Sequence, residues 1–254
     1  MRARLSLFIC SLATFCAVGL GAARLAAAET ALERVRASGE LRIAVDVPYG
    51  KMEFYDADGS LQGVDIDIAR HVARHLGVEP KFEVMPFAEL FDAIDERRAD
   101  VVISAVTITA ERQQKMRFSV PYFDAALQIA VRKGDASIAS LNDLSSKRIG
   151  VLKGTVGETF ALKSEYLDRN RIAVFESNDV RLKALLEKEI DAIIMHFSLK
   201  NHPTLRTLGK PLSQSYYGVV GHLEDETLID AVNRALRDLQ TRGELDKIKE
   251  AHLN

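Results

Sequence analysis

Cysteine is almost absent from the sequence, because its two cysteines, Cys10 and Cys16, both lie in residues 1–28. That stretch has arginines near its start, a long apolar run and three alanines that end at Ala28, which is the layout of a secretory signal peptide. We expect cleavage after Ala28 and a mature chain without thiols, which suits an oxidising compartment because nothing can mispair there. A membrane anchor is the alternative, although Arg24 interrupts the apolar run.

Long apolar runs are missing after residue 28, so the rest of the sequence predicts no membrane span. The residues before each cysteine are bulky, whereas a lipid-attachment site needs a small residue there. These absences favour a free periplasmic protein that is secreted through a cleavable signal peptide.

An excess of positive charge is also absent. The whole chain has 34 basic and 36 acidic residues, and loss of residues 1–28 removes three arginines and no acid, which leaves a net charge of −5. We therefore expect no nucleic-acid partner. The remaining 226 residues are enough for one large domain or two small ones, and we expect two.

Short apolar runs alternate with helical patterns in two stretches, residues 41–105 and 148–195, which predicts α/β units on largely parallel sheets. The first helical pattern ends at Gly77, and Asp65 and Asp67 stand at its start, where the helix dipole favours acids. Its apolar residues form one stripe, which predicts packing of one side on a sheet: Ile68, Ala69, Val72, Ala73 and Leu76.

Extended segments separate and follow these two stretches, at residues 118–134 and 212–222. This layout lets the chain leave one lobe, build a second lobe and return. Residues 225–253 form an amphipathic helical pattern with a break at Gly243, and we expect it to cap the lobe where the chain began.

Two motifs, GVDIDIARHVARHL at 63–76 and TITAERQQKMRFSVPY at 107–122, resemble those of extracellular solute-binding proteins of family 3, the receptors of polar amino acid ABC transporters. The resemblance runs from about Ser38 to the C-terminus, with departures such as Val64. It implies a two-lobed α/β fold of the type II periplasmic-binding-protein class, each lobe a mostly parallel sheet flanked by helices. It also implies a monomer without a cofactor, which binds a polar amino acid or a related small carboxylate and delivers it to a membrane permease.

The resemblance and the order of segments together suggest limits for the lobes. We expect lobe 1 to comprise residues 29–124 and 217–254, and lobe 2 to comprise residues 128–212. A hinge of two segments, at about 124–128 and 212–217, would join them.

The polar stretch around Arg112 carries the predicted ligand site. By the resemblance, Arg112 is the clamp for the carboxylate of the ligand, which a guanidinium binds through two parallel hydrogen bonds. Thr107 contributes its N–H and hydroxyl, and Ser104 lines the same pocket together with the carbonyl group of Ala105.

The second lobe contributes a helix start. Thr155 and Val156 follow an apolar run and open a helix, so we expect their N–H groups to face the anion. The loop lacks the G-K-[ST] ending of a phosphate loop, so a carboxylate site is the more economical interpretation. Tyr49 and Phe87 match aromatic walls in the family and Asp46 matches an acid at the side-chain end, while a core aromatic and a turn cap are the alternatives for Phe87 and Asp46.

His196 stands where the family usually carries an aspartate that neutralises the α-ammonium of the ligand. A neutral imidazole offers at best one acceptor, and a protonated one repels a cation. One hypothesis is that the ligand lacks an α-ammonium or carries a second anionic or acceptor group at this point. The alternative is that His196 fills space, and that Thr107 and the Ala105 carbonyl hold the ammonium unaided.

Other constellations are weaker. His71 and His75 have metal-ligand spacing, but the sequence indicates no third ligand, so we expect no metal site. Two other functions fit the same fold: an enzyme like cyclohexadienyl dehydratase, for which His196 is the conceivable acid or base, and a periplasmic accessory or sensor protein. A non-enzymatic binding protein is the function we expect.

Overall fold

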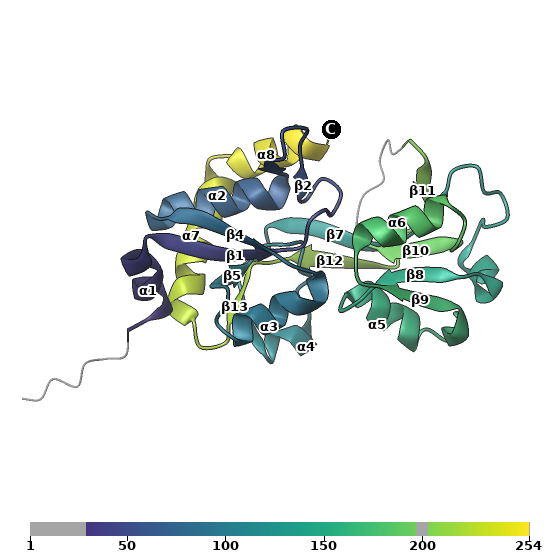
Figure 1. Cartoon of the computed structure of the whole chain (residues 1–254), viewed down its shortest axis with the longest axis horizontal. Coiled ribbons are helices and arrows are strands. Elements are labelled where there is room, and N and C mark those ends of the chain that lie inside the picture. The colour runs from purple at the N-terminus through teal and green to yellow at the C-terminus, as the bar shows by residue number, and fades with distance from the viewer. Residues whose placement is uncertain (1–28, 197–202, 254) are drawn as a thin grey trace, which may run out of the picture.

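The computed structural model describes residues 29–196 and 203–253, so the predicted signal peptide lies outside the described residues. Two α/β lobes lie side by side, each built on its own sheet with helices on both faces (Figure 1). Of the helices in these two ranges, none combines the length and the apolar character that a membrane span needs.

Four strands of the first sheet run in the same direction, and one strand, β13, runs against them. The strand order of this sheet is β4-β1-β5-β13-β6, where β1 runs parallel to β4 and β5, and β13 runs antiparallel to β5 and β6. The strands are β1 (Glu40–Val45), β4 (Glu79–Val84), β5 (Val101–Val102), β6 (Met116–Phe118) and β13 (Val220–His222). The surrounding helices and the small β2-β3 hairpin are α1 (Ala31–Ser38), β2 (Phe54–Tyr55), β3 (Leu61–Gln62), α2 (Val64–Leu76), the 3₁₀ turn η1 (Phe87–Glu89), α3 (Leu90–Asp95), α4 (Ala110–Gln113), α7 (Glu226–Thr241) and α8 (Glu244–Leu253).

The second sheet repeats this plan. Its order is β11-β7-β10-β8-β9, where β10, β8 and β9 are parallel and β7 is antiparallel to β10, β11 and β12. The strands are β7 (Phe123–Arg132), β8 (Ile149–Leu152), β9 (Ile172–Phe175), β10 (Ala192–Met195), β11 (Leu205–Thr207) and β12 (Ser213–Tyr217). The helical elements are η2 (Leu141–Ser146), α5 (Val156–Lys163), η3 (Arg169–Arg171) and α6 (Asn178–Leu186). The two-lobed α/β fold is thus confirmed, with antiparallel strands added beside each parallel core.

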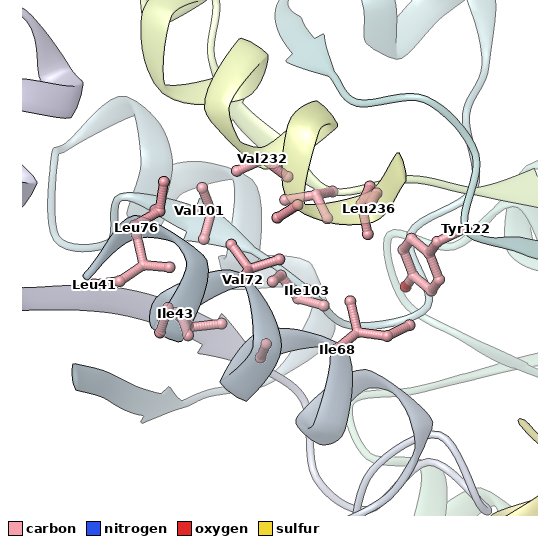
Figure 2. Close-up of a cluster of buried hydrophobic side chains, with 14 of the residues drawn as sticks. Leu41, Ile43, Ile68, Val72, Leu76, Val101, Ile103, Tyr122, Val232 and Leu236 are labelled. Carbon is pink, nitrogen blue, oxygen red and sulfur yellow. The ribbon is translucent and has the colours of Figure 1, made fainter. Parts of the chain in front are cut away.

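The core of the first lobe confirms the predicted stripe of α2. Figure 2 shows Ile68, Val72 and Leu76 of α2 in one cluster with the sheet residues around Ile43 and with Leu236 of the neighbouring helix α7. Every residue of the stripe is buried, and burying one such aliphatic side chain contributes roughly 1.5–3 kcal/mol.

Glycines end the helices of this lobe as the sequence indicates. Gly77 ends α2 in the left-handed conformation, with φ at 79°. Gly243, with φ at 65°, separates α7 from α8. Because α7 packs on α1 and α2, the C-terminal segment returns to the lobe where the chain began, as expected.

Two chain segments pass between the lobes together. The first half of β7 pairs with β12, from Phe123 opposite Tyr217 to Leu127 opposite Ser213. Phe123 and Tyr217 pack on the core of the first lobe, whereas Leu127 belongs to the core of the second. This paired ribbon coincides with the two segments that we expect to act as a hinge, and hinge motion itself stays a prediction.

Candidate functional site

A pocket lies between the two lobes. All ten residues that the sequence predicts for the ligand site line it: Asp46, Tyr49, Phe87, Ser104, Ala105, Thr107, Arg112, Thr155, Val156 and His196. Segments that are more than 100 residues apart in the chain therefore meet at one place. That these residues bind a ligand remains a prediction.

Arg112 lies between the lobes and is held by main-chain groups of both. Its Nη1 donates to the carbonyl of Thr107 at 2.9 Å, and its Nη2 donates to the carbonyl of Gly154 in the other lobe at 3.0 Å. The guanidinium also stacks near the ring of Phe91, 4.9 Å from its centroid. Burial lowers the pKa of Arg112 to about 10, so it stays charged at pH 7. A guanidinium has five N–H donors, so it can still bind a carboxylate.

The start of α5 faces Arg112 across the pocket. Thr155 caps this helix, because its hydroxyl accepts from the N–H of Glu158 at 3.3 Å and donates to the carbonyl of Leu152 at 2.7 Å. The hydroxyl is therefore occupied, and the main-chain N–H groups at Val156 and beyond are the groups left for an anion. The helix packs closely on β10, since a Cβ on Gly157 would lie 3.2 Å from the carbonyl oxygen of Ile194.

Ser104 and Ala105 form the floor of the pocket on the first lobe. The Ser104 hydroxyl donates to Glu53 Oε1 at 2.6 Å and accepts from the N–H of Asp46 at 2.9 Å. Its hydrogen bonds are therefore made within the protein, where they link Glu53 to the main chain at Asp46. Ala105 has a φ of 46°, a left-handed conformation that strains a residue with a side chain. Its N–H donates to Asp65 Oδ2 at 2.6 Å, which stabilises that conformation.

Glu53 and Asp65 form a buried pair of carboxyl groups under this floor. They are 1% and 0% exposed, and a side-chain hydrogen bond links them. Burial and the neighbouring charge of Asp65 raise the pKa of Glu53 well above its usual range, and burial raises the pKa of Asp65 to about 6. Two carboxyl groups in such contact hold a proton between them, so the pair carries less than its full negative charge.

Asp46 lines the pocket at the end of β1 and is 7% exposed. Burial raises its pKa to about 7, although the positive charge of Arg181 opposes the shift. Its Oδ2 has no hydrogen-bond partner in the described part of the chain. This free oxygen favours a ligand contact over a turn cap, because a cap would bond to the backbone that follows it.

His196 follows β10 and is 8% exposed. Its main-chain N–H donates to the hydroxyl of Tyr49 at 3.3 Å, and the Nε2 of its ring lies 3.2 Å from the hydroxyl oxygen of Ser215. Burial, assisted by the positive charge of Arg112, lowers the pKa of His196 to about 4. The imidazole is therefore neutral at pH 7 and supplies no negative charge for an ammonium group.

The aromatic walls lie on the first lobe. Phe87 is 7% exposed and packs edge-on against Phe91, with 5.9 Å between ring centroids. It therefore belongs to the core and also lines the pocket, while its contact with a ligand stays a prediction.

A scan against protein families matches residues 41–254 to the bacterial extracellular solute-binding proteins, family 3. The chain belongs to this family. The L-cystine-binding protein TcyJ of Escherichia coli (strain K12) is 31% identical to it, over 87% of this chain and 85% of the relative. The arginine-binding extracellular protein ArtP of Bacillus subtilis (strain 168) is 30% identical, over 83% of this chain and 84% of the relative.

A solved structure is similar over nearly the whole described chain. The ancestral amino acid-binding protein AncCDT-1, a precursor of cyclohexadienyl dehydratase, matches with a TM-score of 0.82 and 28% identity, over 89% of this chain and 100% of that one. All three similar proteins are named for binding, as we expect for a non-enzymatic member of the family.

Two charged residues of the pocket escaped the sequence analysis, Glu53 and Arg181. Arg181 lies on α6 and is 1% exposed, whereas its neighbour Val180 is 57% exposed. From the sequence, the arginine is expected to be exposed and the neighbouring valine to be buried. The rotation of α6 about its axis, which the sequence does not show, produces the reverse. For Glu53 a signal existed, because this acid stands alone between Met52 and Phe54.

The structure supplies a third residue beside the histidine pair on α2. Asp238 of α7 lies with its Oδ2 3.6 Å from Nε2 of His71, and His75 stacks on His71. The sequence did not indicate this third candidate, and the expected absence of a metal site stays a prediction. Asp238 already pairs with Arg242 at 2.9 Å, and burial lowers the pKa of His71. This group lies outside the pocket, and we assign it no role in binding.

Proposed function

We propose that this protein is the amino acid-binding component of an ABC importer and closes its two lobes over the ligand. The observation that carries the proposal is the position of Arg112, a buried cation with free donors in the pocket between the lobes. The cystine, arginine and amino acid specificities in the names of the relatives support a ligand of this class.

The ligand carboxylate binds Arg112 and the N–H groups at the start of α5. Each is held within its own lobe, Arg112 by the carbonyl of Thr107 and the start of α5 by the Thr155 cap. A buried guanidinium–carboxylate pair selects its ligand strongly, because a ligand without the carboxylate leaves the cation unpaired in the pocket. Tyr49 and Phe87 pack against the apolar part of the ligand.

Closure couples binding to transport in this proposal. Lobe 1 comprises residues 29–124 and 217–254, lobe 2 comprises residues 128–212, and the paired strands β7 and β12 bend between them at about 124–128 and 212–217. Only the closed form contacts the ligand from both sides, so the ligand shifts the equilibrium towards closure by its difference in affinity. A membrane permease then recognises the closed shape.

The family is extracellular by name, and we place this protein in the periplasm as a monomer. Residues 1–28 support this location, since they have the layout of a cleavable signal peptide.

A thermal-shift and calorimetry screen tests the function. The mature protein, residues 29–254, is unfolded and refolded to remove bound solute, and is then titrated with the common L-amino acids, L-cystine and matched organic acids. We expect at least one amino acid to raise Tm strongly, because a ligand at 100 times its Kd stabilises the folded state by about 2.7 kcal/mol. Binding of organic acids alone, or of no small carboxylate, would contradict the proposal.

A further inference from the structure

Arg181 is the largest side chain that is fully buried in the described structure, and it reaches the pocket from α6. Its Nη1 donates to the carbonyl of Ile194 at 3.0 Å and its Nη2 donates to Oδ1 of Asn178 at 2.6 Å. Its Nε has no partner in residues 29–196 and 203–253. A buried guanidinium without an anion is costly, so a partner from outside the chain is the natural explanation.

The acid whose charge acts on the pKa of Arg181, Asp46, stands on the other lobe and does not pair with it. Asp46 and Arg181 attract each other enough to influence both pKa values, yet no ion pair within 4.0 Å joins them in the described ranges. Both line the pocket, and each has an atom without a hydrogen-bond partner, Oδ2 of Asp46 and Nε of Arg181. The space between them is therefore bordered by an acceptor on one lobe and a donor on the other.

The pocket presents two guanidinium groups, whereas a simple amino acid brings one carboxylate. Arg112 and Arg181 supply two positive charges, and His196 is neutral. On the acidic side, the Glu53–Asp65 pair keeps part of its negative charge below the floor but forms no ion pair with either arginine in the described ranges, which leaves Asp46 as the carboxyl group that can meet an ammonium. A ligand with one carboxylate and one ammonium leaves one guanidinium unpaired.

We propose that Arg181 binds a second carboxylate, so that the preferred ligand is an amino acid with a carboxylate at each end and an ammonium group directed to Asp46. This inference rests on the proposed function and narrows its ligand class. One carboxylate binds Arg112 and the start of α5, and the other accepts a hydrogen bond from the unpaired donor of Arg181. The neutral His196 fits this arrangement, because a carboxylate at that position would repel a diacid.

The far end of such a ligand has two possible forms. It is either a plain carboxylate, as in a long acidic amino acid, or a complete amino acid end, as in a disulfide-linked pair of cysteines. The shared chemistry is the second carboxylate, and the free oxygen of Asp46 accommodates an ammonium in either case. Matched ligands separate the two forms.

Calorimetry with three disulfides provides the test on the refolded mature protein. L-cystine is compared with the mixed disulfide of cysteine and cysteamine, which lacks only the second carboxylate, and with that of cysteine and 3-mercaptopropionate, which lacks only the second ammonium. L-glutamate and L-glutamine form a shorter matched pair. We expect the ligand with two carboxylates to bind roughly 10- to 100-fold more tightly than its matched monocarboxylate, as a charged hydrogen bond implies.

The Arg181→Met variant keeps much of the side-chain volume and removes the charge. We expect it to reduce the preference for two carboxylates to within about 3-fold, whereas Arg181→Lys retains part of it. Arg132→Met is the matched control, because Arg132 is a mostly buried arginine of the same lobe that donates to the carbonyls of Leu185 and Ile190 outside the pocket. The control is expected to keep the wild-type preference.

The outcomes are distinct. If the wild type binds monocarboxylic amino acids as tightly as their diacid partners, the inference is wrong while the proposed function stands. If Arg181→Met weakens both members of each pair equally, Arg181 is structural and the inference is again wrong. If no amino acid binds the wild type, the proposed function and the inference fail together. The wild-type ratio decides the matter even if Arg181→Met does not fold.

Discussion

The two walls of the pocket differ in charge although they come from sheets of similar plan. The wall of the first lobe carries the carboxyl groups of Asp46 and Glu53 together with Arg112. In the described lining, the wall of the second lobe has no carboxyl group and contributes Arg181, the neutral His196 and the start of α5. The same α/β frame therefore supports two different tasks, and a ligand with both charges connects the walls when it binds.

The largest expected effect comes from removing the cation that contacts both walls. Arg112→Leu should weaken binding of the natural ligand by about 3 to 5 kcal/mol, which is at least about 100-fold in Kd. The reason is that the ligand carboxylate remains in the pocket without its partner. Calorimetry measures the change.

Arg117→Leu is the control for this variant, because Arg117 bonds to the carbonyl of Leu223 at the outer edge of the first sheet. A Kd within about 3-fold of the wild type for Arg112→Leu, against the loss expected for a buried charge pair, would remove the basis of the proposed function.

The walls also differ in how far the sequence reveals them. Arg112, Ser104 and Thr155 lie at ends of strands and starts of helices, and sequence motifs fix such places because the chain must turn there. Arg181 depends instead on the rotation of a nine-residue helix whose exposed Val180 breaks the usual pattern. Motif spacing thus predicts the anion site. The opposite end of the pocket, where the side chain of the ligand would lie, depends on packing that no local sequence pattern shows.

The fold follows the same division. The two α/β stretches, the stripe on α2 and the return of the C-terminal helices were predictable, since each depends on periodicity and on glycine ends. The antiparallel pairing of strands β12 and β13 was less predictable, because the sequence of an extended segment does not show which strand it pairs with. The burial of Asp65, which stands in the first turn of α2 as expected, depends on the backbone of Ala105.

The next largest expected effect is on the stability of the ligand-free protein, and it comes from the carboxyl groups on the wall of the first lobe. An acid with a higher pKa in the folded state keeps its proton longer there, so stability falls as the pH rises from the unfolded pKa, about 4, to the folded pKa. For Asp46 the folded pKa is about 7, so its share of the stability loss between pH 5 and pH 8 is roughly 2 to 3 kcal/mol. The Glu53–Asp65 pair acts in the same direction and persists in the variant.

Asp46→Asn should remove that share, and urea unfolding of the ligand-free protein at pH 5 and pH 8 measures it. The wild type is expected to lose more stability between these values than Asp46→Asn does. The exposed Asp230 on α7 provides the control variant, Asp230→Asn, which should retain the wild-type pH dependence. Equal pH dependence of the wild type and Asp46→Asn would show that Asp46 is not desolvated and would weaken its assignment to the ammonium.

The smallest expected effect comes from a substitution that makes the charges of the two walls more alike. His196→Asp places a carboxyl group on the second wall, whose position near Arg112 is indicated by the effect of that charge on the pKa of the imidazole. L-glutamate and glutarate differ only in the ammonium group, so the ratio of their Kd values isolates its contribution. The substitution should favour L-glutamate by a further factor of roughly 3 to 10, because a new partner for the ammonium is worth about 1 kcal/mol in a partly screened site.

Ser215→Ala removes the hydrogen-bond partner of the His196 imidazole without adding charge, so it controls for disturbance of the ring. If His196→Asp leaves the ratio of L-glutamate to glutarate unchanged while Ser215→Ala also has no effect, the ammonium does not approach the second wall. Asp46 would then be its sole carboxylate partner, and His196 would serve only to fill space beside Tyr217, whose hydroxyl donates to the His196 carbonyl at 2.7 Å. If the ratio moves as expected, the neutral histidine is a determinant of specificity, because it withholds a charge that the wall has room to carry.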